Sequence, residues 1–387
     1  MKEHKKRILI IGPIGDFGGR ELETGFIASV LSENYEVSIC TTGLLTSSSQ
    51  VFEFNKKQKV FSLKYLVYKK FKSLRFLAFV SYLKNKKKKK KSYYVNNLWA
   101  KKYFDYKKKV KHTLTEIIKE YDLIFISGQL SSDYIKFVIE KGTALNKKIV
   151  FRTTGTIQQD QNFTFLNQVD LFIHHSENNA NRLEIENHNY TIIDQCAFNE
   201  NKLKQIPSVN NKVNFFLTLG RLEKEKNIDI VIKSFLKIKS KDDVLYVIGT
   251  GTELDNLIKI ANNDNAVIFI GFVPNNQLEY YFSKVDCVII SHSNLETGPL
   301  TGIEAMASGK LLISAKTGAM PERLKDISTL WFNNSVESLS EQMIKIKKLD
   351  DFEAFNISNQ IRSRYLQEYS KDVIASKYQN AINDLFI

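Results

Sequence analysis

Two glutamates, Glu296 and Glu304, stand with seven residues between them in a stretch whose residue types suit the binding of a nucleotide. The first lies in a short loop of small residues, and the second lies about one turn into a predicted helix that starts near Leu300. A loop that opens into a helix presents free backbone N–H groups and the positive end of the helix dipole, and both favour a phosphate. A carboxylate at Glu304 can accept hydrogen bonds from the hydroxyls of a ribose. The arrangement predicts a site for a nucleotide that carries a sugar, with Glu296 facing the part beyond the phosphates.

Two basic residues upstream supply the charge that such a nucleotide needs. Arg221 follows the predicted strand Phe215–Leu219, and it therefore lies at the carboxyl end of a strand, where open α/β sheets bind ligands. Lys226 lies five residues further on. The guanidinium fork and the lysine point charge could together neutralise a diphosphate. From the residues alone, ordinary surface basics beside Glu223 and Glu225 are an equal alternative.

Several segments in order resemble those of the family 4 retaining glycosyltransferases, which have the GT-B fold. The two glutamates match the Glu-x7-Glu signature of that family. The segment EAMASGK resembles the EAMA-x-G element of the family, LLISA resembles the strand that follows it, and TGAMPE resembles the Gly-x-x-Glu element after that strand. Upstream, residues 218–227 are similar to the Gly-Arg-Leu…Glu-Lys-Gly/Asn element, and residues 247–251 and 268–273 keep the order of the family. The similarity is dense over residues 213–325 and thin before them.

The resemblance implies a fold, a reaction and a role for single residues. The expected fold class is α/β: GT-B, with two Rossmann-like domains facing a central cleft and a C-terminal helix that crosses back to the N-terminal domain. Glu304 would hold the ribose, and Glu296 would lie near the donor sugar and the reacting centre. Arg221 and Lys226 would stabilise the diphosphate leaving group, so Glu296, Arg221 and Lys226 are the expected catalytic residues.

The same resemblance gives a fuller set of residues for the nucleotide sugar. The set is Gly18, Gly19, Gly220, Arg221, Lys226, Gly249, Gly251, Phe272, Val273, Glu296, Gly298, Pro299, Leu300, Thr301 and Glu304. Pro299 has no N–H, so its neighbours would have to donate. For several members a structural alternative stays open. Residues 249–251 and residues 15–19 could each be a plain turn, and the two glutamates could be surface carboxylates. Glu21 completes the Gly-Gly-x-Glu pattern that begins at Gly18.

One departure from the family lies in the first half of the chain. Many relatives place a histidine after the strand that Ile149–Phe151 is predicted to form, whereas residues 152–156 read Arg-Thr-Thr-Gly-Thr here. The role of that side chain is therefore in doubt. His174 and His175 end a later predicted strand, and we expect them to be structural or to lie on the acceptor side.

The donor is expected to bind without a metal or a separate cofactor. No two aspartates stand two apart, so the Asp-x-Asp metal site of other sugar transferases is missing. Positive side chains and helix dipoles must then stabilise the leaving group. A UDP-sugar is expected ahead of a GDP-sugar as the donor substrate.

Charge is concentrated in one segment. Residues 56–111 hold 21 Lys or Arg and one acid, Asp105, a net charge of +20 in a chain of +14, which leaves −6 for the rest. Lys86–Lys91 are six lysines in a row, and large aromatic residues are interleaved with the basic ones. This composition suits an anionic membrane surface. The alternative is that the lysine run is a solvated, mobile loop; nucleic-acid binding is not expected, because no module for it accompanies the charge.

Length and composition set the outer bounds. The 387 residues, 43% of them hydrophobic, suggest two domains of ordinary size. Cys40, Cys196 and Cys287 are scattered and fit neither a disulfide framework nor a metal site, which favours a reducing compartment. The basic N-terminus enters too short an apolar run for a signal peptide, and no run reaches the length of a membrane span. We expect a cytoplasmic protein that associates peripherally with the inner face of the cell membrane.

Alternating strand and helix patterns predict two parallel sheets with covered faces. The strands expected in the first half are Arg7–Ile11, Glu36–Thr41, Leu123–Ser127, Ile149–Phe151, Val169–His174 and Tyr190–Ile193, and those in the second are Phe215–Leu219, Val244–Ile248, Val267–Ile270, Cys287–Ile290 and Leu311–Ser314. Residues 204–212 read as a linker. The predicted domains are 1–203 for the acceptor, with the basic insertion 56–111, then 204–365 for the nucleotide sugar, and 366–387 as the helix that returns.

The sequence therefore predicts a metal-independent, retaining glycosyltransferase that uses a nucleoside-diphosphate sugar. Its acceptor would be a glycan or glycolipid, lipid-linked or part of a polysaccharide, with the basic segment on an anionic membrane. Two alternatives stay open: a nucleotide-sugar epimerase of the same fold, and a catalytically degenerate nucleotide-sugar-binding subunit.

Overall fold

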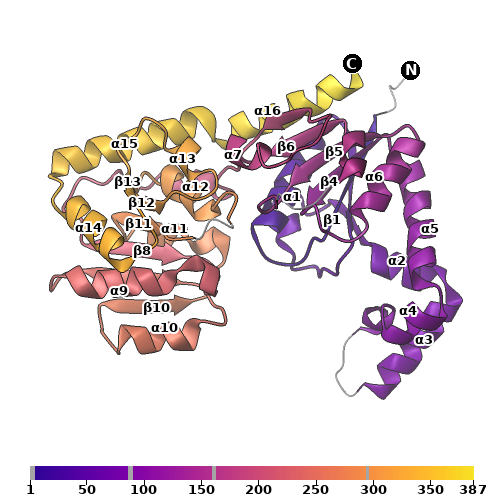
Figure 1. Cartoon of the computed structure of the whole chain (residues 1–387), viewed down its shortest axis with the longest axis horizontal. Coiled ribbons are helices and arrows are strands. Elements are labelled where there is room, and N and C mark those ends of the chain that lie inside the picture. The colour runs from indigo at the N-terminus through magenta and orange to yellow at the C-terminus, as the bar shows by residue number, and fades with distance from the viewer. Residues whose placement is uncertain (1–4, 86–89, 159–162, 293–295) are drawn as a thin grey trace. The chain divides into compact units, whose positions relative to one another are not determined.

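The computed structural model describes residues 5–85, 90–158, 163–292 and 296–387 (Figure 1). The chain forms two compact units. The first comprises Met1–His174, Arg182–Thr191 and Tyr378–Ile387, and the second comprises His175–Asn181 and Ile192–Lys377. The larger segment of the second unit thus begins at Ile192, upstream of the linker predicted at residues 204–212.

The first unit is built on a seven-stranded sheet in the order β3-β2-β1-β4-β5-β6-β7. Its strands are β1 (Arg7–Gly12), β2 (Glu36–Thr41), β3 (Lys59–Ser62), β4 (Leu123–Gly128), β5 (Lys148–Thr153), β6 (Leu171–His174) and β7 (Tyr190–Ile192). The pairs from β3 to β6 are parallel. The strand sequences are short, almost continuous apolar runs because helices cover the sheet.

The second unit is built on a six-stranded parallel sheet in the order β10-β9-β8-β11-β12-β13. Its strands are β8 (Phe215–Leu219), β9 (Val244–Ile248), β10 (Val267–Gly271), β11 (Cys287–Ile290), β12 (Leu311–Ala315) and β13 (Leu330–Phe332). Successive residues of β8 enter different cores: Phe216 joins a cluster on one side of the sheet and Leu217 a cluster on the other. Burial on both faces is the state that a parallel sheet requires.

Helices flank both sheets. Those of the first unit include α1 (Gly19–Leu31), α2 (Leu63–Lys70), α3 (Lys72–Lys84), α4 (Leu98–Tyr103), α5 (Tyr106–Lys119) and α6 (Ile135–Ala144). Those of the second include α7 (Glu177–Ala180), α8 (Glu200–Leu203), α9 (Ile228–Ile238), α10 (Leu254–Ala261), α11 (Glu279–Phe282), α12 (Leu300–Ala307), α13 (Met320–Arg323), α14 (Val336–Lys347) and α15 (Asp351–Glu368). In α9 the buried residues Ile228, Val231, Ile232 and Phe235 follow the helical period, which places this face on the sheet.

The last helix, α16 (Lys371–Asn383), ends in the first unit. Tyr378 packs its ring near that of Phe125 in β4, with 6.5 Å between the ring centroids. Near the end of the helix, the hydroxyl of Tyr35 donates to Oδ1 of Asn383 at 2.5 Å. The C-terminal residues therefore return to the first unit, and the predicted α/β fold class is confirmed.

The order of strands reverses at one place in each sheet. In the first unit this place lies between β1 and β4, and in the second it lies between β8 and β11. Loops that leave the carboxyl ends of parallel strands on either side of such a reversal diverge, and ligands bind in the crevice between them. The loop after β8 holds residues 220–227, and the loop after β11 begins at Ser291. The fold therefore brings the two predicted groups of donor-site residues to one edge.

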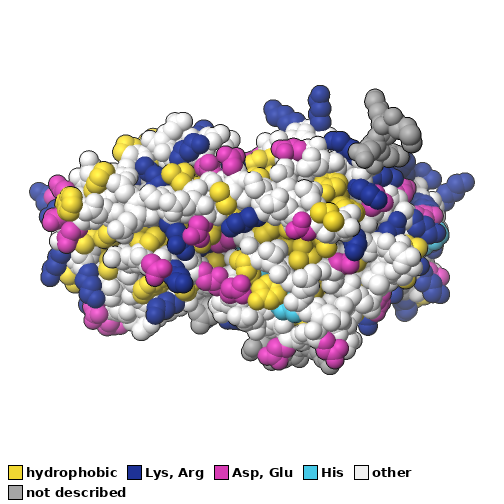
Figure 2. All heavy atoms as spheres, turned by 90° about the horizontal axis from the view of Figure 1, so that it is seen from above, with side chains coloured by type: hydrophobic (Ala, Val, Ile, Leu, Met, Phe, Trp, Pro, Cys, Tyr) yellow, Lys and Arg dark blue, Asp and Glu magenta, His cyan; other side chains and the backbone are white. Residues whose placement is uncertain are grey.

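The basic segment is folded where it is described. It contributes β3 to the sheet of the first unit, together with helices α2 to α5, of which α3 and α4 project away from the sheet (Figure 1). The alternative of a solvated loop was made for the lysine run Lys86–Lys91, and Lys86–Lys89 of that run lie outside the described residues. Elsewhere the charges are mixed: on the face shown in Figure 2, basic and acidic side chains of the second unit (blue and magenta, left) are interspersed.

Candidate functional site

The loop after β8 is held to the neighbouring strand by backbone hydrogen bonds. Gly220 N–H donates to the carbonyl of Ile248 at 3.0 Å, and Leu222 N–H donates to that of Thr250 at 2.9 Å. A short 3-10 turn, η4 (Lys224–Lys226), then carries Lys226 back toward the sheet. Lys226 is 8% exposed, so its ammonium is fixed in a buried position and is not a surface charge.

Lys226 forms an ion pair with Glu296, so the structure brings two of the predicted catalytic residues into contact. Backbone contacts fix the loops that carry them. The hydroxyl of Ser291 donates to the carbonyl of Lys226 at 2.6 Å, and the side-chain amide of Asn227 donates to the carbonyl of Ser291 at 3.0 Å. The loops after β8 and β11 are therefore joined side by side. Burial raises the pKa of Glu296, but Lys226, His292 and Arg221 outweigh it, and the net pKa lies below its usual value.

His292 is a site residue that the sequence interpretation missed. Its Nδ1 lies 3.7 Å from Oε2 of Glu296 and is buried without a hydrogen-bond partner among the described residues. Burial and the nearby Lys226 cation lower the pKa of His292 to about 4, although Glu296 opposes this shift. The imidazole is therefore neutral at pH 7. Its position two residues after the end of the buried strand β11 was the sequence signal that could have identified it.

Arg221 lies in the same loop but faces solvent. Its side chain is exposed, and one guanidinium nitrogen lies 3.6 Å from Glu225. Surface pairs of this kind contribute little, so the side chain can leave Glu225 at small cost. The second predicted diphosphate residue is thus available to a ligand, whereas Lys226 is already engaged.

The predicted phosphate-binding loop is anchored by a residue from further along the chain. Residues 297–299 lead into α12, which starts at Leu300 as expected, and Thr301 Oγ1 contacts the carbonyl of Leu219 in β8 at 3.4 Å. Arg323 is fully buried and donates to both carboxylate oxygens of Asp194 at 2.7 Å. Its third contact is with the carbonyl of Pro299 at 2.6 Å. Gly298 is buried beside this guanidinium.

Glu304 lies further along α12 and is 1% exposed. Asn275 donates its side-chain amide to Oε1 of Glu304 at 2.5 Å. Burial raises the pKa of Glu304 to about 8, and the Asn275 hydrogen bond opposes this only in part. Asn275 follows the predicted base-reading residues Phe272 and Val273, of which Phe272 is 59% exposed. The structure thus links the predicted ribose carboxyl to the predicted base segment.

Gly249 and Gly251 lie against the loop after β8, whereas the sequence had left open whether they line the site or form a plain turn. Gly249 has φ +136°, and a Cβ there would lie 1.8 Å from the carbonyl oxygen of Gly220. A Cβ on Gly251 would lie 2.3 Å from the carbonyl oxygen of Leu222. Both glycines therefore allow the β9 loop to lie against the β8 loop. They support the site by shaping its backbone.

In the first unit, Gly18 and Gly19 join β1 to α1. Gly18 has φ +142°, and its N–H donates to the side chain of Gln50 at 2.8 Å. Glu21, the predicted glutamate of the Gly-Gly-x-Glu pattern, accepts from the N–H of Gly15 at 2.7 Å. The carboxylate thus closes the loop upon the first turn of α1. This contact supports the structural alternative for Glu21.

Arg152 lies in β5, the strand after which many relatives have a histidine. It is fully buried in β5 and donates to Oε1 of Glu23 in α1 at 2.5 and 3.2 Å. Because both charges are buried and paired, this arginine ties α1 to the sheet. It does not replace a solvent-facing histidine.

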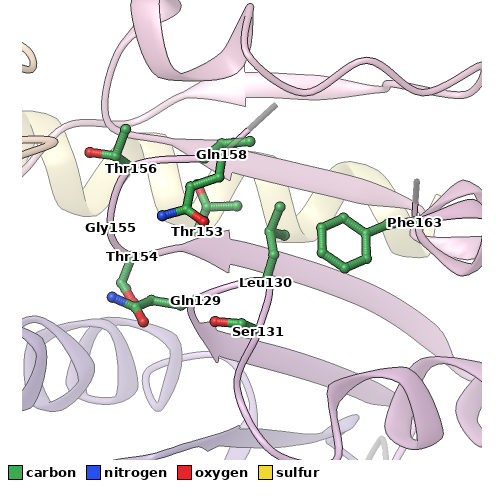
Figure 3. Close-up of a pocket in the computed structure, with 10 residues that line it drawn as sticks. Gln129, Leu130, Ser131, Thr153, Thr154, Gly155, Thr156, Gln158 and Phe163 are labelled. Atoms are coloured by element: carbon green, nitrogen blue, oxygen red, sulfur yellow. The ribbon is translucent and has the colours of Figure 1, made fainter. Parts of the chain in front are cut away.

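A small pocket of about 120 Å³ opens beyond the carboxyl ends of β4 and β5 (Figure 3). Its lining is uncharged: Gln129, Leu130, Ser131, Thr153, Thr154, Gly155, Thr156, Ile157, Gln158 and Phe163. Leu130 and Phe163 lie side by side, while amide and hydroxyl groups from Gln129, Thr154 and Gln158 lie across from them. Thr154 Oγ1 is buried and has no hydrogen-bond partner among the described residues. The lining suits a neutral ligand with hydroxyl groups.

His174 and His175 are adjacent in the sequence but belong to different units. His174 belongs to the first unit, where Nδ1 contacts Thr153 Oγ1 at 2.8 Å and Nε2 contacts His188 at 3.0 Å. His175 is buried in the second unit near Gly298. The contacts of His174 with its neighbours are those of a structural residue. Among the described residues, no group of three or more His, Cys, Asp and Glu is placed to hold a metal ion.

Comparison with known proteins finds a family model that is similar to part of the second unit. The model of the family described as glycosyl transferases group 1 matches residues 199–364. This stretch contains every predicted donor-site residue except Gly18 and Gly19. Residues 199–364, less than half of the chain, are thus similar to the glycosyl transferases of group 1. The resemblance of the chain to GT-B glycosyltransferases of family 4 is thereby confirmed.

Two curated proteins show how far the similarity extends. N-acetyl-alpha-D-glucosaminyl L-malate synthase of Bacillus anthracis is 22% identical over 205 residues, which are 51% of this chain and 53% of that protein. Alpha-monoglucosyldiacylglycerol synthase of Streptococcus pneumoniae is 35% identical over 103 residues, which are 25% and 23% of the two chains. The match therefore spans about half of the first relative and about a quarter of the second.

A solved structure matches over nearly the whole length. HepE of Anabaena in complex with UDP has a TM-score of 0.71 and 15% identity, over 98% of this chain and 100% of that one. At this identity the likeness shows the fold. Within the described residues, no helix is both long enough and apolar enough to span a bilayer.

Proposed function

We propose that this protein is a glycosyltransferase that moves a sugar from a nucleoside-diphosphate sugar to a hydroxyl acceptor. The observation that carries the proposal is the contact between Lys226 and Glu296 beside the strand reversal of the second sheet. A buried cation, an exposed Arg221 and a helix start lie near one another there. These groups suit a diphosphate, and Glu296 is positioned next to them for the attached sugar.

The proposed chemistry relies on positive charge at the leaving group. The bond between the anomeric carbon and the β-phosphate oxygen breaks, and the acceptor oxygen bonds to the same carbon. The acceptor proton passes to the departing phosphate oxygen, which leaves as the nucleoside diphosphate. Arg221 and Lys226 stabilise the negative charge that grows on the diphosphate. Retention of the anomeric configuration, with attack on the leaving-group face, follows the family resemblance.

The donor is proposed to be a UDP-sugar. Supporting this choice, HepE of Anabaena, which shares the fold, was solved with UDP. In this chain Glu304 is hydrogen-bonded to Asn275, which follows the exposed Phe272 by three residues, and this arrangement suits a ribose beside a base. Titration with UDP and GDP in parallel tests the base.

The acceptor is proposed to be a glycan or glycolipid that reaches the first unit. The neutral pocket after β4 and β5 offers amide and hydroxyl groups with an aromatic ring, which suits a sugar. The name of the Streptococcus pneumoniae relative refers to a diacylglycerol lipid. Together with the basic segment, this supports a lipid-linked or polysaccharide acceptor at the inner, cytoplasmic face of an anionic membrane.

Metal independence is part of the proposal. Lys226 and Arg221 supply at the diphosphate the charge that a divalent ion supplies elsewhere. Activity should therefore continue in excess chelator. Dependence on added magnesium or manganese would contradict this part of the proposal.

A panel of UDP- and GDP-sugars tests the function and its alternatives. Incubation with water alone and then with glycan or glycolipid acceptors should release nucleoside diphosphate and form a glycoside with the donor configuration. An epimerase would convert the nucleotide sugar without releasing the diphosphate. A degenerate subunit would bind the nucleotide sugar and yield no product. The last two results would each overturn the proposed transfer.

A further inference from the structure

The basic segment exposes large apolar side chains on one face of a helix. In α3, Leu74 and Ala78 are buried, whereas Phe76, Phe79 and Leu83 are exposed, Phe76 to 68%. Their spacing of three and seven residues places the exposed side chains along one stripe. The helix therefore has a second apolar face that its own unit does not cover.

The neighbouring α4 extends this surface. Leu98 is 81% exposed and Trp99 65% exposed, and the rings of Trp99 and Tyr103 lie 5.4 Å apart. The side-chain amide of Asn97, just before α4, donates to Ser81 Oγ in α3 at 2.7 Å, which holds the two helices together. The two helices lie next to each other at the end of the projection (Figure 1). Exposed apolar surfaces of this kind mark interaction sites.

Basic side chains surround these apolar ones. Arg75, Lys84, Lys101 and Lys102 are exposed on the same two helices, and Lys91 places its ammonium 4.9 Å from the ring centre of Phe79. The one acid of the segment, Asp105, lies beside Lys108. Lysine and arginine can lay their alkyl stems along apolar surface while the charge remains in water. Aromatic rings with basic neighbours are the composition of helices that lie in a membrane interface.

We propose that α3 and α4 form a membrane-inserting surface, in which Phe76, Phe79, Leu83, Leu98, Trp99 and Tyr103 enter the boundary between headgroups and acyl chains of an anionic bilayer. The surrounding basic residues contact the lipid phosphates. This deepens the proposed function by naming the surface that meets a lipid-borne acceptor. It rests on that function only for its biological purpose, because the surface itself is independent of the donor site.

Lipid explains the surface better than nucleic acid does. Aromatic rings stack on bases, and lysines bind phosphates, so a single strand would use part of this composition. However, Leu98, the most exposed member, and Leu83 are aliphatic and offer nothing to a base. In acyl chains both would gain the full transfer energy of their side chains. Binding should therefore keep a component that salt does not remove.

The test uses the full chain and vesicles of phosphatidylcholine with or without phosphatidylglycerol. The chain has two tryptophans, so in a Trp331→Phe variant the fluorescence reports Trp99 alone. The emission of Trp99 should shift to the blue on anionic vesicles and be quenched by lipids brominated on the acyl chain. Flotation with the vesicles should require phosphatidylglycerol and should weaken as salt rises, but a fraction of the protein should remain bound to the vesicles at high salt.

Matched variants assign the effect to this surface. The triple change Phe76→Ser, Leu98→Ser and Trp99→Ser should lower vesicle affinity by more than about tenfold, because burial of even one large apolar side chain accounts for about that factor. Phe352→Ser serves as the control, since Phe352 is 73% exposed on α15 of the second unit. Nucleoside-diphosphate release from a UDP-sugar, measured without vesicles, should stay unchanged in all variants.

Several results would overturn the insertion. Equal flotation of the triple variant and wild type, or an unshifted and unquenched Trp99, would remove it. Self-association that the triple variant abolishes, without vesicle binding, would assign the surface to a second copy. Retained binding to single-stranded nucleic acid in place of vesicles would assign it to that partner. None of these results bears on release of the diphosphate, so the two proposals fail separately.

Discussion

Nζ of Lys226 pairs with Oε2 of Glu296 across 70 positions of sequence. A buried cation and a carboxylate thus neutralise each other in the place where a diphosphate is proposed to bind. When the diphosphate arrives, its negative charge competes with Glu296 for Lys226. Glu296 would then be released toward the donor sugar, with His292 next to it as its remaining neighbour.

Replacing Lys226 should remove most of the activity. In Lys226→Ala, the ratio kcat/KM for the donor should fall by about a hundredfold to a thousandfold, because losing one electrostatic donor costs about 3–4 kcal/mol of barrier. Release of the nucleoside diphosphate measures it. Lys224→Ala is the control, since Lys224 is exposed in the same turn. Equal kinetics of the two variants would show that burial of Lys226 has no part in transfer.

The two glutamates should have different kinetic effects. Glu304→Gln should mainly raise the KM of the donor and the Kd of UDP, because a ribose contact is made in the ground state and the transition state alike. Glu296→Gln should mainly lower kcat. Steady-state kinetics with calorimetric UDP binding separate the two. If UDP binds the Glu304 variant as tightly as wild type, the ribose role is wrong.

His292 should make the second unit sensitive to acid. The folded state lowers its pKa to about 4 from the usual 6.5, so an unfolded chain takes up the proton first as the pH falls. The stability present above pH 6.5 is lost progressively down to about pH 4, at about 1.4 kcal/mol per pKa unit. The drop in Tm between pH 7.5 and pH 4.5 should be smaller in His292→Gln. An identical drop in both proteins would contradict this.

Arg323 should contribute to stability and to donor binding by separate contacts. Arg323→Met leaves the buried Asp194 without its partner, a change that typically costs about 3–5 kcal/mol, and Tm should fall. A second change, Asp194→Leu, should recover much of this stability. The hydrogen bond to the Pro299 carbonyl stays lost in both, so the KM of the donor should remain raised. Recovery of KM together with Tm would show that the contact with Pro299 does not order the loop.

Strands of continuous apolar residues were predicted well from the sequence. β2, β8, β9 and β11 have the predicted bounds, because parallel strands buried on both faces give unmistakable short runs. The short edge strands β3 and β13 were missed, since β3 lies among lysines and β13 has only three residues. The helices of the basic segment were missed for a similar reason. Their buried residues, such as Leu74 and Ala78, are few beside the charged ones.

The site was predicted in outline but not in its contacts. Spacing placed Arg221, Lys226 and Glu296 on loops, and parallel topology brings those loops together. Pairing of Lys226 with Glu296, however, depends on side-chain directions that no local pattern encodes. The partners Arg323 and Asp194 lie 129 positions apart, so their contact could not be read from a single sequence.

Calorimetric titration of UDP into the chain in the presence of excess chelator tests the proposed donor site most directly. UDP should bind without metal, and its affinity should be about tenfold or more weaker in Lys226→Ala and unchanged in Lys224→Ala, because a charge-assisted contact to phosphate is worth about 1.5–3 kcal/mol. Absence of UDP and GDP binding, or equal affinity in the two lysine variants, would contradict the proposed donor site.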